Sequence, residues 1–241
     1  MPAIDPNRLR RQIEELRLQV GDPSGLRRSI VRLVEEYSDR TRRQGRREST
    51  VPGSVHRSVL QALQEALAND PDAAAQAAEA LWRAEPTEAK LLAAGLLGPQ
   101  HGSFAADLAE RWATQGPPAK VIEAVGEFAL TGWRRGDPGE FLQRAQTWLG
   151  DRNRLLALYS LRSAVRDPEF EDLPAVFQLL SGLAGGVRGE SKRAFVQLIH
   201  ALEARAPRET ARFLDEEVQT GDPNPAWMTT LLKGSTERSP R

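Results

Sequence analysis

Two glutamates one helical turn apart are the strongest candidates in this chain for acid–base chemistry. Glu123 and Glu127 lie in the segment 121–128, VIEAVGEF, whose other residues are apolar or glycine. Because the segment is apolar, at least one of these carboxyl groups should lie near buried surface. Burial raises the pKa of a carboxyl group and suits it to proton transfer. The alternative is that both glutamates lie on the solvated face of an amphipathic helix.

Basic residues recur where the second helices of successive predicted helix pairs begin. They are Arg152, Arg154, Arg188, Lys192 and Arg193. Equivalent positions in stacked helix pairs line one face, and a basic stripe on such a face can follow a phosphate backbone. The alternative is ion pairing on the helix surface, because Asp151 and Glu190 lie close by in the sequence.

Two tryptophans are candidates for stacking on DNA. Trp133 stands at a predicted helix end beside Arg134 and Arg135, so an aromatic face and two phosphate-binding side chains coincide. Trp148 closes the predicted helix 137–149. For both tryptophans, the alternative is packing between neighbouring helices.

Motifs for nucleotide binding and for nucleophilic or metal catalysis are absent from the sequence. It contains no P-loop, no G-x-S-x-G and no H-E-x-x-H. Cysteine is absent, and the three histidines, His56, His101 and His200, are far apart. We therefore expect no cofactor and no metal site.

Helical periodicity extends over almost the whole chain. Leu9, Ile13, Leu16 and Val20 lie on one helical stripe. Each Asp-Pro pair predicts the start of a new helix, because aspartate caps a helix and proline suits its first turn. These pairs begin at positions 5, 22, 70, 137, 167 and 222. No segment alternates with period two, so we predict no strand.

From residue 70 onward the predicted helices form about five pairs. They are 72–84 with 86–98, 101–114 with 118–133, 137–149 with 151–166, 172–184 with 189–205, and 207–220 with 224–233. Their spacing of about 35–40 residues is typical of helical-pair repeats. We predict an all-α fold, a HEAT-like α-solenoid of antiparallel helix pairs.

We expect a single domain over residues 1–241. Residues 1–68 would form an N-terminal helical cap, with a polar, arginine-rich connector at 38–54, and residues 70–233 the helix pairs. The tail 234–241 is expected to be disordered. No apolar run reaches the ~20 residues of a membrane span, so we expect no membrane contact and a cytoplasmic location.

The charge balance constrains the class of partner. Lys plus Arg and Asp plus Glu each number 33, so the net charge is zero and binding of polyanions by the whole surface is disfavoured. Only four of the basic residues are lysine. Arginine suits phosphate and carboxylate recognition, although a GC-rich genome also explains the excess.

Several segments resemble the DNA-alkylation-repair HEAT-like family, the AlkD-like glycosylases. Residues 80–93, ALWRAEPTEAKLLA, are similar to the family's LW…E.RLLA segment. Residues 147–153, TWLGDRN, resemble its tryptophan followed by a polar break, and residues 198–214 and 30–42 provide further likeness. Together the resemblance covers nearly the whole chain, in motifs that are helix-packing patterns.

The resemblance implies an α-solenoid whose basic concave face holds duplex DNA. Active family members hydrolyse the N-glycosidic bond of alkylated purines with an aspartate flanked by tryptophans. Glu123 stands near the place of that aspartate, and residues 119–120 lack the flanking tryptophan. The family's later tryptophan falls at Gln197, and its helper arginine falls at Leu158.

We therefore expect a DNA-repair-type protein whose partner is duplex DNA, with Glu123 as the candidate catalytic carboxylate. The alternative is a non-catalytic scaffold that binds a protein partner, which is the commonest use of HEAT arrays. Convergence of the arginines on one face would favour DNA, and an apolar groove would favour a scaffold.

Overall fold

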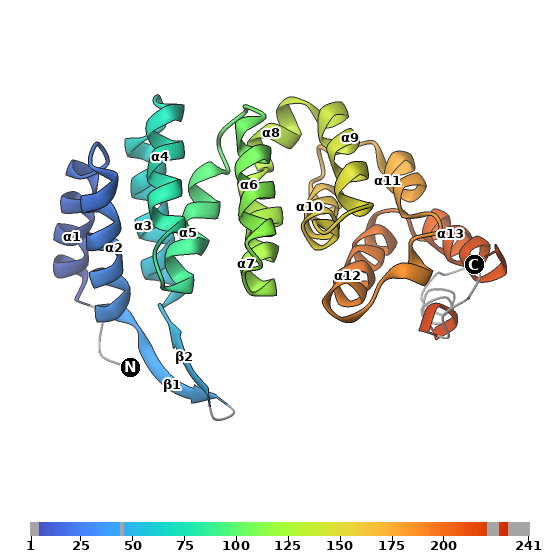
Figure 1. Ribbon diagram of the computed structural model, residues 1–241, viewed down its shortest axis with the longest axis horizontal. Helices are drawn as coiled ribbons and strands as arrows, with labels where there is room; N and C mark the ends of the chain where they lie inside the picture. The colour runs from blue at the N-terminus through green and yellow to red at the C-terminus, as the bar shows by residue number, and fades with distance from the viewer. Residues whose placement is uncertain (1–4, 44–45, 221–226, 231–241) are drawn as a thin grey trace. The chain divides into compact units, whose positions relative to one another are not determined.

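Helices make up most of the chain in the computed structural model, which describes residues 5–43, 46–220 and 227–230 (Figure 1). The predicted all-α class is confirmed. The chain divides into two compact units. One is formed by Met1–Ala109 with Phe128–Trp133, and the other by Glu110–Glu127 with Arg134–Arg241.

The first unit contains five complete helices and a hairpin. These are α1 (Pro6–Leu18), α2 (Pro23–Tyr37), β1 (Asp39–Arg43), β2 (Arg46–Thr50), α3 (Gly53–Ala66), α4 (Pro71–Trp82) and α5 (Thr87–Leu97). Helix α4 packs against α2 and α5, and α3 packs against α1 and α5. Helix α6 (Phe104–Thr114) begins in this unit and continues into the second.

The hairpin differs from the polar connector predicted for this stretch. Strands β1 and β2 pair antiparallel, from Asp39 opposite Thr50 to Arg43 opposite Arg46. Backbone hydrogen bonds form this ladder, so it needs none of the apolar alternation on which the sequence prediction relied. The prediction of no strand is therefore wrong at this position.

The second unit contains the remaining helices. These are α7 (Ala119–Ala124), the π-helix η1 (Val125–Ala129), α8 (Thr131–Gly136), α9 (Pro138–Leu149), α10 (Arg154–Arg166), α11 (Leu173–Leu180), the 3-10 helix η2 (Ala184–Gly186), α12 (Gly189–Arg205) and α13 (Pro207–Thr220). Parts of η1 and α8 belong to the first unit. Helix α10 is central, because it packs against α7, α9 and α12.

The Asp-Pro pairs explain where many helices begin. In four of them the aspartate caps the helix by accepting backbone N–H groups; these are Asp5, Asp22, Asp70 and Asp137. Asp167 behaves differently: it ends α10, and α11 begins only after its own cap, Asp172. The pair at 222–223 lies outside the described residues.

The predicted helix 118–133 is not continuous. It is divided into α7, the π-helix η1 and α8. A side chain on Gly126 would lie 2.9 Å from both Ser160 N and Tyr159 Cβ, so only glycine permits this close approach to α10. The wider turn of η1 accompanies this approach, between Glu123 on α7 and the end of the segment.

The other predicted pairs agree with the structure in most of their extent. The pairs 72–84 with 86–98 and 137–149 with 151–166 are confirmed as α4 with α5 and α9 with α10. Helix α11 ends earlier than predicted, at Leu180, and Gly182 then adopts a positive φ of 71°. Of the predicted helix 224–233, residues 227–230 are described and helical, and the tail 234–241 lies outside the described residues.

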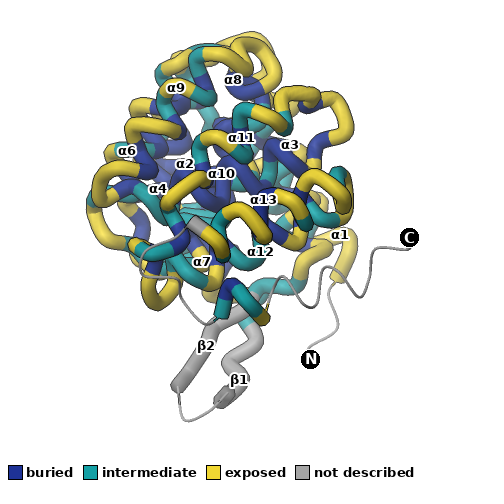
Figure 2. Tube along the Cα trace, turned by 90° about the vertical axis from the view of Figure 1, so that its right-hand side faces the viewer, coloured by how far each residue is buried: buried dark blue, intermediate teal, exposed yellow. Residues whose placement is uncertain are grey.

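Each unit has its own apolar core. In the first, Leu26, Ile30 and Leu63 are fully buried, and in the second Phe141 and Phe195 are. Burying each such side chain contributes about 1.5–3 kcal/mol. Figure 2 shows buried and exposed stretches alternating along the helices, as the amphipathic periodicity of the sequence predicts.

Candidate functional site

Glu123 lies at the surface of the second unit and is held by an arginine from a neighbouring helix. Its side chain is 35% exposed, and its Oε1 accepts a hydrogen bond of 2.8 Å from Arg162 Nη2. Arg162 belongs to α10, which packs directly against α7. The ion pair therefore fixes the position of the candidate carboxylate relative to α10.

Arg162 joins side chains from three elements. Its own side chain is only 3% exposed, and Nη2 also contacts Glu127 Oε2 at 3.3 Å. Its Nη1 donates to Gln197 Oε1 on α12, and its guanidinium lies 5.0 Å from the centre of the Tyr159 ring. A buried guanidinium requires such partners, because removing it from water is costly. We call Glu123, Glu127, Tyr159, Arg162 and Gln197 the Arg162 cluster.

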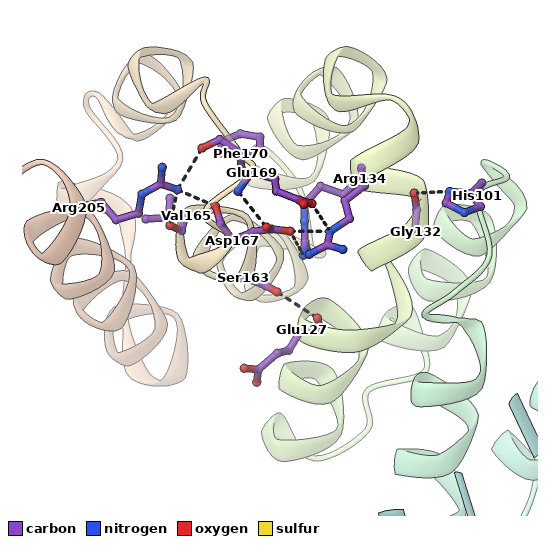
Figure 3. A network of polar contacts seen from close by, with 11 residues as sticks. His101, Glu127, Gly132, Arg134, Ser163, Val165, Asp167, Glu169, Phe170 and Arg205 are labelled. Carbon is purple, nitrogen blue, oxygen red and sulfur yellow. Dashed lines mark hydrogen bonds and ion pairs between the residues drawn. The ribbon is translucent and has the colours of Figure 1, made fainter. Parts of the chain in front are cut away.

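The π-helix η1 supports one side of the Arg162 cluster. Ser163 Oγ on α10 donates to the backbone oxygen of Glu127 at 3.0 Å (Figure 3). Arg166 Nη1 lies 3.7 Å from Glu127 Oε1. Single π-helical turns occur often at functional sites, where they redirect side chains. Here the turn places Glu127 on the same guanidinium as Glu123.

Tyr159 connects the Arg162 cluster to the buried side of α10. It is 2% exposed, and burial, followed by the nearby Glu123 carboxylate, raises the pKa of its phenol. Glu190 and Arg193 at the start of α12 also act on this group. The charges in the first turn of α12 therefore influence Tyr159.

The position that the resemblance gives to a helper arginine does not hold an arginine in contact with Glu123. The resemblance gives it to Leu158, but Leu158 is fully buried in the core. The arginine that contacts Glu123 is Arg162, one helical turn later. Gln197, at the place of the family's later tryptophan, does reach the cluster, through its oxygen on Arg162.

Neither Arg162 nor Tyr159 was predicted as a site residue. The sequence does contain a signal for Arg162, which is the single charged residue within LLALYSLRSAV, an otherwise almost apolar helix. A charge placed there has to be buried, and a buried charge has to be paired.

Arg134 and Arg135, predicted to bind DNA, are engaged by a carboxylate of their own unit (Figure 3). Arg135 Nε donates to Asp167 Oδ2 at 2.8 Å, and Arg134 Nη2 lies 4.0 Å from the same atom. The Arg134 side chain is 3% exposed, and burial lowers its pKa to about 10. Arg134 is therefore not placed to meet a phosphate.

Arg154 and Arg188 bond to backbone carbonyl groups of the segment 182–189, which joins α11 to α12. Arg154 donates from Nε to Leu149 O at 2.8 Å and from Nη1 to Gly186 O at 3.1 Å. Arg188 Nη1 donates to the carbonyl oxygens of Gly185 and Val187, at 2.7 and 2.8 Å. These bonds are structural, although Arg188 remains exposed.

Three predicted DNA contacts keep their charges accessible at the starts of α10 and α12. Arg152 is exposed, and no side-chain partner is found for it among the described residues. Arg193 is exposed and pairs with Glu190 at 3.5 Å. Lys192 is half-buried, with its ammonium 5.1 Å from the centre of the Trp227 ring. These positions support a smaller basic surface than the sequence predicted.

The two candidate tryptophans lie in the core. Trp133 is 1% exposed and Trp148 is 0% exposed. Trp148 Nε1 donates to Glu110 Oε2 at 3.0 Å, which satisfies its polar atom internally. Neither ring presents a face to solvent, so stacking on DNA is corrected to helix packing for both residues.

Within the described part of the chain, no group of three or more His, Asp and Glu side chains is arranged to hold a metal ion. No helix found in those same ranges has the length and apolar character to cross a bilayer. Comparisons with protein-family models, with curated proteins and with solved structures found no match for this chain.

Proposed function

We propose that the helix pairs stack as a HEAT-like α-solenoid that binds duplex DNA, with Glu123 facing the bound strand. The packing within the units supports the solenoid. Helices α4 with α5, α9 with α10, and α12 with α13 are in contact as pairs, and α10 touches both α7 and α12. Second helices thus lie side by side, as they do along the inner face of helical-pair repeats.

The observation that carries the proposal is the ion pair between Glu123 and Arg162. The resemblance implies a carboxylate near position 123 and an arginine that assists it. A partly exposed carboxylate beside a buried cation is held in one geometry, which is what electrostatic stabilisation of a cationic sugar requires. In the catalytic form of the proposal, Glu123 orients water during hydrolysis of the N-glycosidic bond of an alkylated purine.

Three accessible cations support the part of the proposal that concerns binding of duplex DNA. Arg152, Lys192 and Arg193 lie at the starts of the two second helices that carry Arg162 and Gln197. Cations at equivalent helix positions are spaced along one face, where they can meet successive phosphates.

The test is the affinity of the protein for a short duplex at two salt concentrations. We expect binding that is micromolar or tighter and weakens steeply with salt, because phosphate contacts release counterions. Arg193→Ala should weaken binding and reduce the salt slope by about one. Arg212→Ala is the matched control, since Arg212 is 83% exposed on α13 and pairs with Glu216 on its own helix, as Arg193 pairs with Glu190. Absence of binding even at low salt overturns the proposal.

A second measurement separates a binder from an enzyme. The protein is incubated with duplex containing a methylated purine, and the released base is quantified. Release that Glu123→Gln abolishes would support the glycosylase. Binding without release leaves a non-catalytic DNA-binding protein.

A protein-binding scaffold is the second candidate. It is favoured by the internal bonds of Arg134, Arg135, Arg154 and Arg188, which remove much of the predicted basic surface. This candidate predicts no binding of duplex at any salt concentration, which is the outcome that overturns the DNA proposal.

A further inference from the structure

Gln197 retains hydrogen-bonding capacity that the fold does not use. A guanidinium has only donors, so the amide oxygen of Gln197 is the atom that must face Arg162. Its Nε2 then points its two N–H groups elsewhere. In residues 5–43, 46–220 and 227–230 no acceptor is found for them, and Gln197 is partly exposed.

Glu123 has an unused hydrogen-bond acceptor, which complements the unused donors of Gln197. Its Oε1 accepts from Arg162 Nη2 at 2.8 Å, and no partner is found for Oε2 among the described residues. The carboxylate on α7 and the amide on α12 are thus held by the two terminal nitrogens of one planar guanidinium. An unused acceptor and a pair of unused donors are therefore held by one guanidinium, on two partly exposed side chains.

The support beneath this pair is rigid. Arg162 is buried, contacts Glu127 and lies against the Tyr159 ring, so its guanidinium is fixed between them. Preorganised polar groups select a ligand by its pattern of donors and acceptors, because rearranging them costs free energy.

We propose that Glu123 and Gln197 bind the edge of an unpaired nucleobase in DNA. This inference rests on the proposed DNA binding. A base edge presents an acceptor beside a donor, as the ring nitrogen and the N6 amino group of adenine do. Gln197 Nε2 donates to the ring nitrogen, and Glu123 Oε2 accepts from the amino group.

The exposure of the pair explains why the base is unpaired. The Glu123 side chain is 35% exposed on α7, which packs against α10. A base that has left the stack can bring its edge to such a surface, whereas a paired base has its pairing edge occupied. Lys192 and Arg193, in the first turn of the helix that carries Gln197, are placed to hold the flanking phosphates.

The experiment compares three short duplexes by fluorescence anisotropy at low salt. One is fully paired, one has a bulged adenine, and one has a bulged purine that lacks the 6-amino group. We expect the wild-type protein to bind the bulged adenine about tenfold more tightly than the purine analogue, the effect of one lost base contact.

Gln197→Glu tests the donor directly. The variant keeps an oxygen facing Arg162 and replaces the outward N–H groups by an acceptor that faces the acceptor nitrogen of the base. The affinity for both bulged duplexes should therefore fall about tenfold. Gln178→Glu, at an exposed position on α11, makes the same chemical change and should keep the wild-type affinities.

The outcomes separate this inference from the proposed function. Equal wild-type affinity for all three duplexes overturns the base contact and leaves DNA binding intact. Failure to bind any duplex overturns DNA binding, and the base contact with it. The duplex comparison uses only the wild-type protein, so it decides the question even if Gln197→Glu does not fold.

Discussion

Two charged clusters in the second unit differ in which charges they bury. In the Arg162 cluster the buried group is the cation, and its carboxylates, Glu123 and Glu127, are 35% and 30% exposed. Around Asp167 the anion, 6% exposed, is buried together with one cation, Arg134, and the other cation, Arg135, is 51% exposed. The same ion-pair chemistry therefore joins helices in both places.

The two clusters also differ in the hydrogen-bonding groups that they leave unpaired at the surface. Around Asp167 a backbone group binds the second carboxylate oxygen: Glu169 N donates to Asp167 Oδ1 at 3.2 Å. Arg205 Nη1 donates to the carbonyl oxygens of Val165, Asp167 and Phe170, and so caps the end of α10 (Figure 3). The Arg162 cluster instead leaves a carboxylate oxygen and an amide at the surface. We interpret the Asp167 cluster as stabilising the fold and the Arg162 cluster as a binding site.

The largest effect should follow from breaking the Asp167 cluster. Asp167→Asn leaves Arg134, 3% exposed, without its closest anionic partner. Loss of one partner from a buried ion pair costs about 3–5 kcal/mol of the free energy of unfolding. Urea unfolding followed by circular dichroism measures this cost. A cost below about 1 kcal/mol would show that Arg134 is paired by other means.

The pH dependence of stability should report the same group. The Arg135 hydrogen bond holds the pKa of Asp167 below its ordinary value of 3.8. The ionised carboxylate therefore stabilises the fold fully above about pH 5, and this contribution is lost as the pH falls through the lowered pKa. The gap in urea midpoint between wild type and Asp167→Asn should be constant from pH 7 to 5 and narrow below about pH 4. A gap that stays constant to pH 3 would contradict this assignment.

Removing the buried cation should have a smaller effect. Arg162→Met keeps a long apolar stem, and Glu123 and Glu127 can turn toward water, so we expect a loss of about 1 kcal/mol. The variant should also lose the preference for a bulged adenine, because nothing then aligns Glu123 with Gln197. Thermal unfolding and the duplex comparison measure the two effects. Destabilisation equal to that of Asp167→Asn would remove the distinction between the clusters.

The helices could be predicted from residues that are close in the sequence. The candidate site could not, because its side chains come from positions far apart in the sequence. Asp5 and Asp137 cap helices because their partners lie two or three residues away. Arg162 meets Glu123 and Gln197 at separations of 39 and 35 residues, which no local pattern encodes. Asp167 has the same Asp-Pro signal as the true caps, but Arg135 from another helix engages its side chain and α10 ends there.

The sequence also did not show which of the predicted site residues are buried in the core. From the sequence, Trp133 beside Arg134 and Arg135 can be interpreted equally well as a DNA-stacking residue or as a packing residue. Its neighbours in the sequence are compatible with both interpretations. Only the tertiary structure separates them, with Trp133 1% exposed. Glu123 could be named from the sequence, whereas its partner Arg162 could not, because the resemblance pointed to Leu158, one helical turn earlier.

The smallest effect should come from the exposed side of the Asp167 cluster. Arg135→Gln removes a cation that is 51% exposed but leaves Arg134 beside the buried carboxylate. Because water and salt screen an exposed pair, we expect a slight decrease in melting temperature at low salt that disappears at high salt. Differential scanning calorimetry of Arg135→Gln and wild type at both salt concentrations measures it. A decrease as large as that of Asp167→Asn, and independent of salt, would mean that Arg135 rather than Arg134 is the cation that the buried aspartate requires.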